Sequence, residues 1–222
     1  MNRGGRGRAE IKVSTFSRPA HSSSPQAGHS AVADMLRVID AIASLIEPSH
    51  PLLGAGSMVL TDIISAPYPG RSVIPYQCHV TYDRRLLPGE TRNLVLDALK
   101  ERLSFYDIKS SIEIKPNTEV TYAGERLAGD KFFPAWVFPE EHTLVQMALN
   151  GLKSANINPA IQAYRFCTNA VYSAGTAGIP TIGFGIGREE DAHIIDESIS
   201  VADLETAMRG YQGIIRAVCS DK

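Results

Sequence analysis

The sequence has few cysteines, no long apolar run and no strong excess of charge. Its three cysteines are far apart, form no C-x-x-C pair and are odd in number: Cys78, Cys167 and Cys219. This pattern excludes a cysteine zinc knuckle and predicts a reducing, cytoplasmic location. No apolar stretch reaches the roughly 18 residues that span a bilayer, and the first residues lack the apolar core of a signal peptide. We therefore expect no membrane partner.

The charge balance argues against a nucleic-acid partner as well. The formal net charge of the 222 residues is −2, so the chain lacks the basic footprint that binds phosphates. With 44% hydrophobic and 21% charged residues, it can bury a real core in one large domain or two small ones.

The first half of the chain has strand and helix patterns in the order β-α-β-β-α-β. We expect strands at 10–14, 57–65, 76–83 and 111–115, and helices at 30–47 and from Pro88 onward. This order predicts an α+β fold, a four-stranded antiparallel sheet with two helices on one face. In the third strand Cys78, Val80 and Tyr82 alternate with polar residues, which predicts one wet face. The open sheet has an edge strand that a second copy of the chain could cover.

The second half alternates helix and strand, as in an α/β layer. Residues 117–138 look like an irregular linker, and Pro139-Glu-Glu is expected to open a helix. The apolar run at 179–184 predicts a buried strand, and Ser200 with Asp203 predicts a capping box for a final helix over 201–218. Two or three strands are too few for a complete α/β domain, so we expect an exposed apolar face on residues 139–218.

Between that strand and the last helix lies a glycine-rich loop with a single histidine. Gly183, Gly185 and Gly187 precede His193, which acidic residues flank. Taken alone, a single histidine is better explained as a polar loop residue, and the glycines do not form a nucleotide-binding fingerprint.

Three stretches together resemble one family. They are Gly7-Arg-Ala-Glu-Ile with Arg18-Pro-Ala-His21-Ser-Ser-Ser-Pro; Ser72-Val-Ile-Pro75 with Asp83-Arg-Arg85; and Gly178-Ile-Pro-Thr-Ile-Gly-Phe-Gly with Ala192-His193-Ile-Ile-Asp-Glu197. The sequence resembles the dinuclear zinc amidohydrolases and exopeptidases that include aminoacylase, acetylornithine deacetylase, succinyl-diaminopimelate desuccinylase and glutamate carboxypeptidase.

The resemblance implies a domain organisation. Residues 6–116 match the family's lid domain, which mediates homodimerisation. Residues 117–222 match the C-terminal segment of the α/β catalytic domain, so that this domain is incomplete here. The family's first catalytic segment carries a His-x-Asp motif and most ligands of two zinc ions, and this sequence has no His-x-Asp. Glu140-Glu141 does not sit where the family has its catalytic base.

The resemblance also implies roles for individual residues. His193 matches the family's last zinc ligand, and His21 matches a lid histidine that stabilises the oxyanion in the neighbouring subunit's site. Arg85 matches an arginine that binds the substrate carboxylate. Arg84 is its rival in register, and the alternation leaves open which of the two faces the site.

Further contacts are expected from the second half. Thr168, Asn169 and Gly185 are expected to contact substrate. Two positions depart from the family: Ser72 replaces a frequent asparagine, and Asn169 is neutral where many relatives have an acid. The remaining histidines are expected to be structural or at the surface: His29, His50, His79 and His142.

Taken together, the resemblance predicts part of a zinc-dependent hydrolase, a deacetylase or metallopeptidase. The complete enzyme would cleave the amide bond of an N-acyl amino acid or small peptide, and this chain alone would be inactive. The alternative from another class is a non-catalytic dimerisation module or a truncated gene product.

Overall fold

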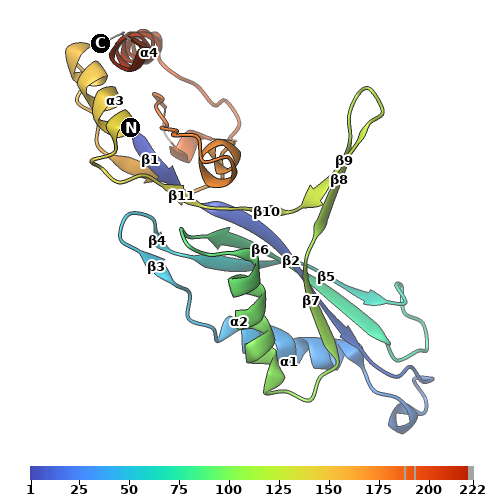
Figure 1. The fold of residues 1–222 in the computed structure, drawn as a ribbon. Helices are drawn as coiled ribbons and strands as arrows, with labels where there is room; N and C mark the ends of the chain where they lie inside the picture. The colour runs from blue at the N-terminus through green and yellow to red at the C-terminus, as the bar shows by residue number, and fades with distance from the viewer. Residues whose placement is uncertain (188, 193, 220–222) are drawn as a thin grey trace. The chain divides into compact units, whose positions relative to one another are not determined.

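The computed structural model describes residues 1–187, 189–192 and 194–219. The chain forms two compact units (Figure 1). One unit is Gly7–Ala135, and the other consists of Met1–Arg6 together with Trp136–Lys222. Each unit is described separately below.

The Gly7–Ala135 unit is built on an antiparallel sheet. Strands β2 (Gly7–Phe16) and β6 (Gln77–Leu86) pair in its centre, and β5 (Ser57–Ala66) pairs with the far side of β6. On the other side of β2 lie β7 (Ser110–Ile114) and the short β10 (Phe132–Phe133). The order is that of a split β-α-β fold, as the sequence pattern predicted.

Two helices cover one face of this sheet (Figure 1). They are α1 (Ala31–Ala43) and α2 (Arg92–Ser104), and both bury residues in the same core as β2 and β6. Shorter elements are η1 (Pro25–Ala27), β3 (Ser49–His50) and β4 (Gly54–Ala55). The predicted α+β lid fold, a sheet with two helices on one face, is therefore confirmed.

The alternation on β6 follows the predicted pattern over its whole length. Residues Cys78, Val80 and Tyr82 are buried against the helices, whereas His79 and Thr81 lie on the other face and are half-buried. The core partners from β2 are Ala9, Ile11 and Val13. Because side chains of a strand alternate between faces, the helix-covered face is apolar and the uncovered face is polar.

Tyr82 introduces a buried hydroxyl into that core, and this gives a prediction at alkaline pH. The residue is 4% exposed, and its hydroxyl has no hydrogen-bond partner among the described residues. Burial raises the pKa of Tyr82 from its ordinary value of 10.0 to about 12. Below pH 10 the side chain is neutral in both states; between pH 10 and 12 the unfolded state loses its proton first, so stability falls as pH rises.

Tyr82→Phe is expected to remove that loss, which amounts to about 1.4 kcal/mol at pH 11, halfway between the two pKa values, and to about 3 kcal/mol above both of them. Denaturant unfolding of both proteins at pH 7, 9 and 11 measures it. The unfolding curves of the wild type and the variant should be similar at pH 7. At pH 11 the variant should be more stable than the wild type. An equal decline of both proteins between pH 9 and 11 would contradict the assignment.

The helix boundaries of this unit differ from the predicted ones. Helix α1 starts after its N-cap Ser30, as expected, but ends at Ala43 rather than near Glu47. Helix α2 starts at Arg92, because the Thr91 hydroxyl accepts the Leu94 N–H at 3.3 Å, so the predicted start at Pro88 is wrong. In both cases a cap hydroxyl marks the first turn.

The expectation of an irregular linker at 117–138 is also wrong. Strands β8 (Pro116–Val120) and β9 (Arg126–Asp130) form a hairpin that projects from the sheet (Figure 1). Its turn contains Gly124, whose φ of +83° suits glycine. All but one of its ten strand residues are exposed, so no apolar alternation marks the strands in the sequence.

The second unit has a three-stranded sheet with β1 (Asn2–Gly5) in its centre. Strand β11 (Trp136–Val137) pairs with it antiparallel, and β12 (Gln162–Tyr164) pairs with it in parallel. The predicted strand at 179–184 is wrong: only Gly183 pairs, through two 2.7 Å backbone hydrogen bonds with Asn2. The remaining elements are α3 (Thr143–Ser154), η2 (Val171–Thr176), η3 (Glu189–Asp191) and α4 (Val201–Cys219).

Helices α3 and α4 meet at two glycines. A Cβ atom on Gly213 would lie 2.2 Å from the Gly151 carbonyl oxygen, so neither position tolerates a larger residue without movement. Helix α3 begins at Thr143, where the His142 ring accepts the Leu144 N–H at 3.2 Å. The expectation that Glu140-Glu141 opens this helix is therefore wrong, and His142 is structural, as expected. The capping box is present at α4, where Ser200 Oγ accepts the Asp203 N–H at 3.0 Å.

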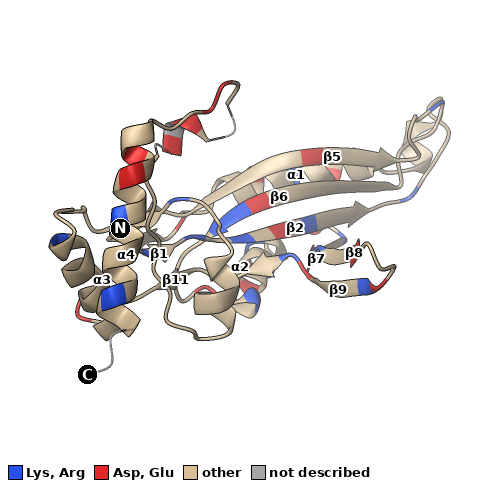
Figure 2. Cartoon of the chain, turned by 90° about the horizontal axis from the view of Figure 1, so that it is seen from above, with Lys and Arg blue, Asp and Glu red and all other residues tan. Residues whose placement is uncertain are grey.

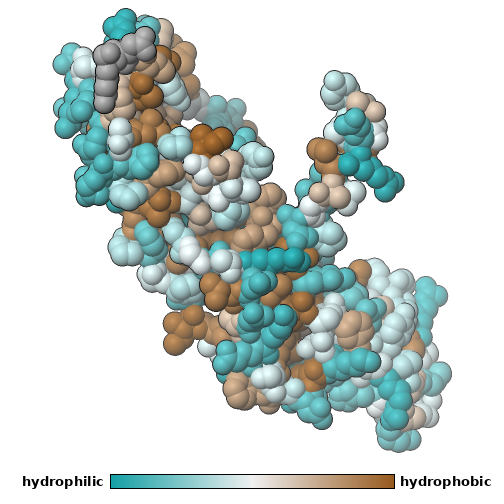
Figure 3. Space-filling view, in the orientation of Figure 1, coloured by the Kyte–Doolittle hydropathy of each residue, from teal (hydrophilic) through white to brown (hydrophobic). Residues whose placement is uncertain are grey.

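The predicted exposed apolar face is confirmed in this unit. The stripe of α4 lies on the surface, with large side chains about half exposed, and apolar side chains lie at the surface around α3 and α4 (Figure 3). The stripe consists of Leu204, Met208, Tyr211 and Ile215. None of the helices in the described part of the chain is both long and apolar enough to cross a membrane.

Candidate functional site

The loop with His21 is held against the segment Ser72–Pro75. His21 forms a bridge with Val73, and the Ile74 N–H donates to the Ala20 carbonyl at 2.8 Å. The Ser22 N–H donates to the Ser72 carbonyl at 3.1 Å. Two of the sequence motifs therefore lie side by side at one end of the sheet in the Gly7–Ala135 unit.

The ring of His21 has a defined orientation. Its Nδ1 accepts the Ser23 backbone N–H at 3.2 Å and lies 2.7 Å from the Ser23 hydroxyl oxygen. A backbone N–H can only donate, so the neutral ring carries its proton on Nε2. The side chain is exposed. An exposed imidazole with a fixed N–H donor suits the oxyanion role expected for this residue.

Nearby His29 contributes to the same loop rather than to a site. Its Nε2 lies 2.8 Å from an oxygen of the buried Asp34 in the first turn of α1. Its own N–H donates to the Arg18 carbonyl at 2.9 Å. His29 therefore connects the loop to the helix.

Ser72 has a φ of +52°, in the left-handed region. That conformation costs most residues about 1–2 kcal/mol, and asparagine tolerates it better because its side chain bonds locally. The backbone thus explains why an asparagine is expected at this position.

Ser72→Asn is expected to stabilise the protein by about 0.5 kcal/mol by relieving this strain. Ser72→Val, which is β-branched, should destabilise it by about 1–2 kcal/mol. Denaturant midpoints of the two variants test the pair. If Ser72→Val is as stable as the wild type, the backbone at Ser72 is not strained.

The two neighbouring arginines on β6 face opposite sides of the sheet. Arg84 points to the helix-covered face and is buried, with two acidic partners. Arg85 lies on the uncovered face, where its Nε is 3.2 Å from an oxygen of Asp83. Of the two, only Arg85 lies on the open face of the sheet, and its role in binding a substrate stays a prediction.

The buried ion cluster around Arg84 was not apparent in the sequence. Its Nη1 lies 2.9 Å from Glu47 and its Nη2 lies 2.6 Å from Glu90. Glu90 also accepts the Leu87 N–H at 2.7 Å. The cluster joins the segment after α1, strand β6 and the turn before α2.

His21 and Arg85 of one chain lie at opposite ends of the sheet. His21 follows β2 beyond the Phe16–Gln77 pair, whereas Arg85 pairs with Arg8 near the other end. Eight residue steps of roughly 3.4 Å put Gln77 and Arg85 about 27 Å apart. One small substrate therefore cannot touch both side chains of the same chain.

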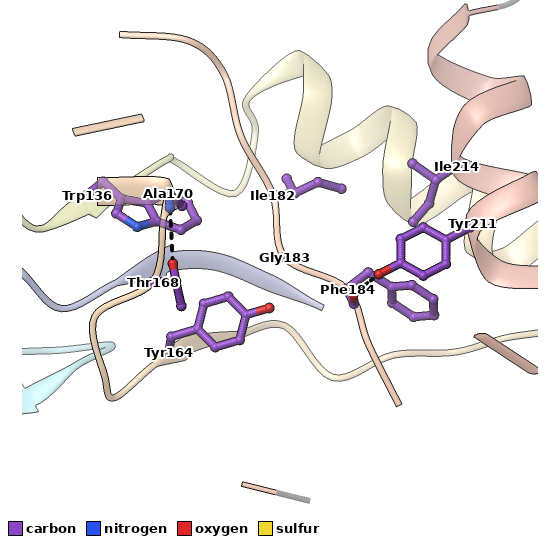
Figure 4. A pocket seen from close by; sticks show the side chains of 9 residues that line it. All are labelled: Trp136, Tyr164, Thr168, Ala170, Ile182, Gly183, Phe184, Tyr211 and Ile214. Atoms are coloured by element: carbon purple, nitrogen blue, oxygen red, sulfur yellow. Dashed lines mark hydrogen bonds between the residues drawn. The ribbon is translucent and has the colours of Figure 1, made fainter. Parts of the chain in front are cut away.

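In the other unit, Thr168 lines a pocket of about 320 Å³. The Thr168 hydroxyl accepts the Ala170 N–H at 3.3 Å, and the Tyr211 hydroxyl donates to the Phe184 carbonyl at 2.5 Å (Figure 4). No sequence pattern indicated this pocket, because its aromatic lining comes from distant segments. It is lined by Trp136, Tyr164, Thr168, Ala170, Ile182, Gly183, Phe184, Tyr211 and Ile214.

The other expected substrate residues in this unit lie on the surface. Asn169 and Gly185 are exposed and do not line the pocket. A Cβ on Gly185 would meet no atom within 4 Å, whereas one on Gly183 would overlap the Tyr164 ring at 2.3 Å. Glycine is therefore needed for packing at Gly183.

The expected metal ligand His193 lies outside the described residues. Among residues 1–187, 189–192 and 194–219, no group of three or more His, Cys, Asp or Glu side chains could hold a metal ion. A protein zinc site takes three or four such ligands. The described residues by themselves therefore do not fit a zinc centre.

Comparison with known proteins agrees with this architecture. The family profile described as "Peptidase dimerisation domain" matches residues 3–110. The protein YgeY of Escherichia coli strain K12, described as uncharacterized, is 28% identical over 215 residues, which are 96% of this chain and 53% of the relative. This chain thus spans about half the length of the curated relatives it matches.

Solved structures share the fold. The aminopeptidase PepT from Bacillus cereus aligns with a TM-score of 0.71 and 18% identity, covering 98% of this chain and 53% of its own. An M20 family metallo-carboxypeptidase from Sulfolobus solfataricus aligns with a TM-score of 0.65 and 14% identity. The alignment covers 96% of this chain and 59% of the carboxypeptidase. The family resemblance drawn from the three motifs is confirmed by the profile match, in which residues 3–110 match a peptidase dimerisation domain.

Proposed function

We propose that this chain is the lid domain and the C-terminal catalytic segment of a zinc-dependent amidohydrolase or peptidase. The lid corresponds to residues 6–116 and the catalytic segment to residues 117–222. The substrate is an N-acyl amino acid or a small peptide. The observation that carries the proposal is the match of residues 3–110 to a peptidase dimerisation domain.

The geometry of the lid unit supports the roles of two residues. His21 presents a fixed N–H donor that can stabilise an oxyanion. Arg85 presents a guanidinium on the open face of the sheet, where it can bind a carboxylate in a bidentate manner. Because the two lie at opposite ends of the sheet, we infer that His21 acts in the site of a partner subunit.

The partner subunit is a second copy of this chain, bound along β5. This strand pairs only with β6 among the described strands, so its other edge is unpaired. Four of its apolar residues have exposed fractions between 38% and 56%: Val59, Leu60, Ile63 and Ile64. A long apolar edge is a template for strand pairing, and a twofold interface would bury it.

Zinc binding is proposed for the complete enzyme, with His193 as the ligand from this chain. Thr168, Asn169 and Gly185 are proposed to contact the substrate from the catalytic segment. The remaining zinc ligands and the catalytic base would come from a segment equivalent to the other half of the relatives. We therefore propose that the chain by itself neither holds two zinc ions nor hydrolyses amides.

Metal analysis after dialysis, combined with an assay on N-acetyl amino acids and dipeptides, tests this proposal. The chain alone should show no turnover and no stoichiometric zinc. When joined to the missing segment it should gain both, and His193→Ala should then abolish turnover and lower the zinc content. Full activity and zinc content in that variant would contradict the assignment.

A second candidate is a non-catalytic dimerisation module. It is favoured by the absence of a metal-binding group among the described residues. It predicts a dimer that stays inactive even when the missing segment is supplied, and the same assay distinguishes the two.

A further inference from the structure

The pocket at Thr168 is lined by aromatic, aliphatic and hydroxyl-bearing residues and by no charged one (Figure 4). Four of the lining residues are aromatic: Trp136, Tyr164, Phe184 and Tyr211. Figure 2 shows acidic residues of this unit on the loop before α4 and at the start of that helix, and none of them lines the pocket. An ion in this pocket would lose hydration without gaining a counter-charge. The part of a ligand that enters the pocket is therefore neutral.

The aromatic walls of the pocket are held in place by the protein itself. The Tyr211 hydroxyl donates to the Phe184 carbonyl, and the two rings meet edge to face with centroids 5.3 Å apart. A Cβ on Gly210 would lie 2.5 Å from the Phe184 ring, and one on Gly183 would lie 2.3 Å from the Tyr164 ring. Both rings thus pack directly on glycine backbone. Walls that are already ordered cost little entropy when a ligand binds.

The volume of the pocket fits an aromatic ring together with the group beside it. A cavity of roughly 150 Å³ holds a benzene molecule, and this pocket has about 320 Å³. The remaining space suits an amide group, which an N-acyl amino acid carries next to its side chain. A mostly apolar lining with a few polar groups, at about this size, is typical of small-molecule sites.

Two hydroxyl groups supply the polar contacts of the pocket. The Thr168 hydroxyl accepts the Ala170 N–H at 3.3 Å, so its own proton remains for a ligand. Among the side chains drawn in Figure 4, none bonds to the hydroxyl of Tyr164. A hydroxyl can donate to a carbonyl oxygen, so both groups suit the carbonyl of an amide beside the bound ring.

We propose that this pocket binds an aromatic side chain of the substrate, while Thr168 and Tyr164 donate to the carbonyl oxygen of the adjoining amide. The substrate is then an N-acyl aromatic amino acid or a small peptide with an aromatic residue. The assignment rests on the proposed function, through the substrate contact proposed for Thr168. It gives Tyr164, Phe184 and Tyr211 the selection of the side chain.

Fluorescence of Trp136 tests binding, because this residue is the chain's only tryptophan and lines the pocket. The full chain is titrated with N-acetylphenylalaninamide and N-acetylalaninamide, two neutral ligands that make no demand on Arg85. The phenylalanine ligand should bind about tenfold more tightly. Tenfold corresponds to about 1.4 kcal/mol, within reach of one buried and paired aromatic ring. Equal affinities for the two ligands would overturn the proposal.

Three variants locate the binding site. Ala170→Phe places a ring in the pocket and should abolish the preference for the phenylalanine ligand. Tyr164→Phe, a smaller change that guards against a folding defect, should weaken both ligands about threefold and keep the preference. Tyr172→Ala is the control, because Tyr172 is 70% exposed in the same unit and does not line the pocket. A preference that survives Ala170→Phe would place the ligand elsewhere and overturn the proposal.

Hydrolysis by the complete enzyme distinguishes a wrong pocket from a wrong function. Joined to the missing segment, the chain should hydrolyse N-acetylphenylalanine with a kcat/KM about tenfold above that for N-acetylalanine. Equal values would mean that the pocket does not receive the side chain, for instance because the joined segment fills it, and the proposed function would stand. If neither compound nor any dipeptide is hydrolysed, the proposed function fails, and with it the role of the pocket in substrate selection.

Discussion

Arg84→Ala is expected to destabilise the Gly7–Ala135 unit by about 2–3 kcal/mol, because it removes a buried guanidinium from two partly buried carboxylates. The side chain of Arg84 is 11% exposed. Its Nη1 lies 2.9 Å from a carboxylate oxygen of Glu47, and its Nη2 lies 2.6 Å from one of Glu90. Such a loss is a large part of the 5–15 kcal/mol that typically stabilises a folded protein. Denaturant unfolding measures it.

The control for this variant is an exposed ion pair in the same unit. Lys100 and Asp97 lie 3.1 Å apart with side chains more than half exposed. Lys100→Ala should cost about 0–0.5 kcal/mol, since exposed pairs contribute little. If Arg84→Ala costs no more than Lys100→Ala, the buried cluster does not stabilise the unit. Arg84→Met, which fills the space without the charge, distinguishes lost packing from uncompensated carboxylates.

His21→Ala is expected to lower kcat of the complete enzyme by about 10²–10³-fold, the loss seen when one oxyanion donor is removed. The proposed donor is the exposed His21 ring, whose Nε2 proton is fixed because Nδ1 accepts the Ser23 N–H. His29→Ala is the matched control, because His29 lies in the same loop but bonds to Asp34. It should leave kcat nearly unchanged.

A mixture of two inactive variants tests whether His21 acts in the partner's site. Mixing His21→Ala with Arg85→Gln subunits should restore about a quarter of the activity, because half the dimers are hybrids and each has one intact site. No recovery on mixing would mean that both residues act within one chain.

The sequence patterns predicted features that depend on alternation and local chemistry. Residues within a few positions of one another determine three of these features. They are the alternating faces of β6, the Ser200 cap of α4 and the β-α-β-β-α-β order of the first half. The exposed stripe of α4 was predicted because the second half has too few strands to cover it.

Features that depend on distant contacts or on exposed backbone were not predictable. The Arg84 cluster needs Glu47, 37 residues away in the sequence. The β8–β9 hairpin is exposed on both faces and has no apolar period. The run at 179–184 is apolar, yet Ile179 is 56% exposed, because only Gly183 finds a strand partner there.

Sedimentation equilibrium of the full chain and of its Ile63→Lys variant tests the proposed dimerisation along β5. Dimerisation along β5 predicts a particle of about twice the chain mass of 24.1 kDa for the wild type, and a monomer for the variant. Ile46→Lys, at an apolar residue that is 96% exposed but lies off β5, should remain a dimer. A monomeric wild type would contradict dimerisation along β5. So would a dimer that persists in Ile63→Lys but dissociates in Met208→Lys, a change on α4.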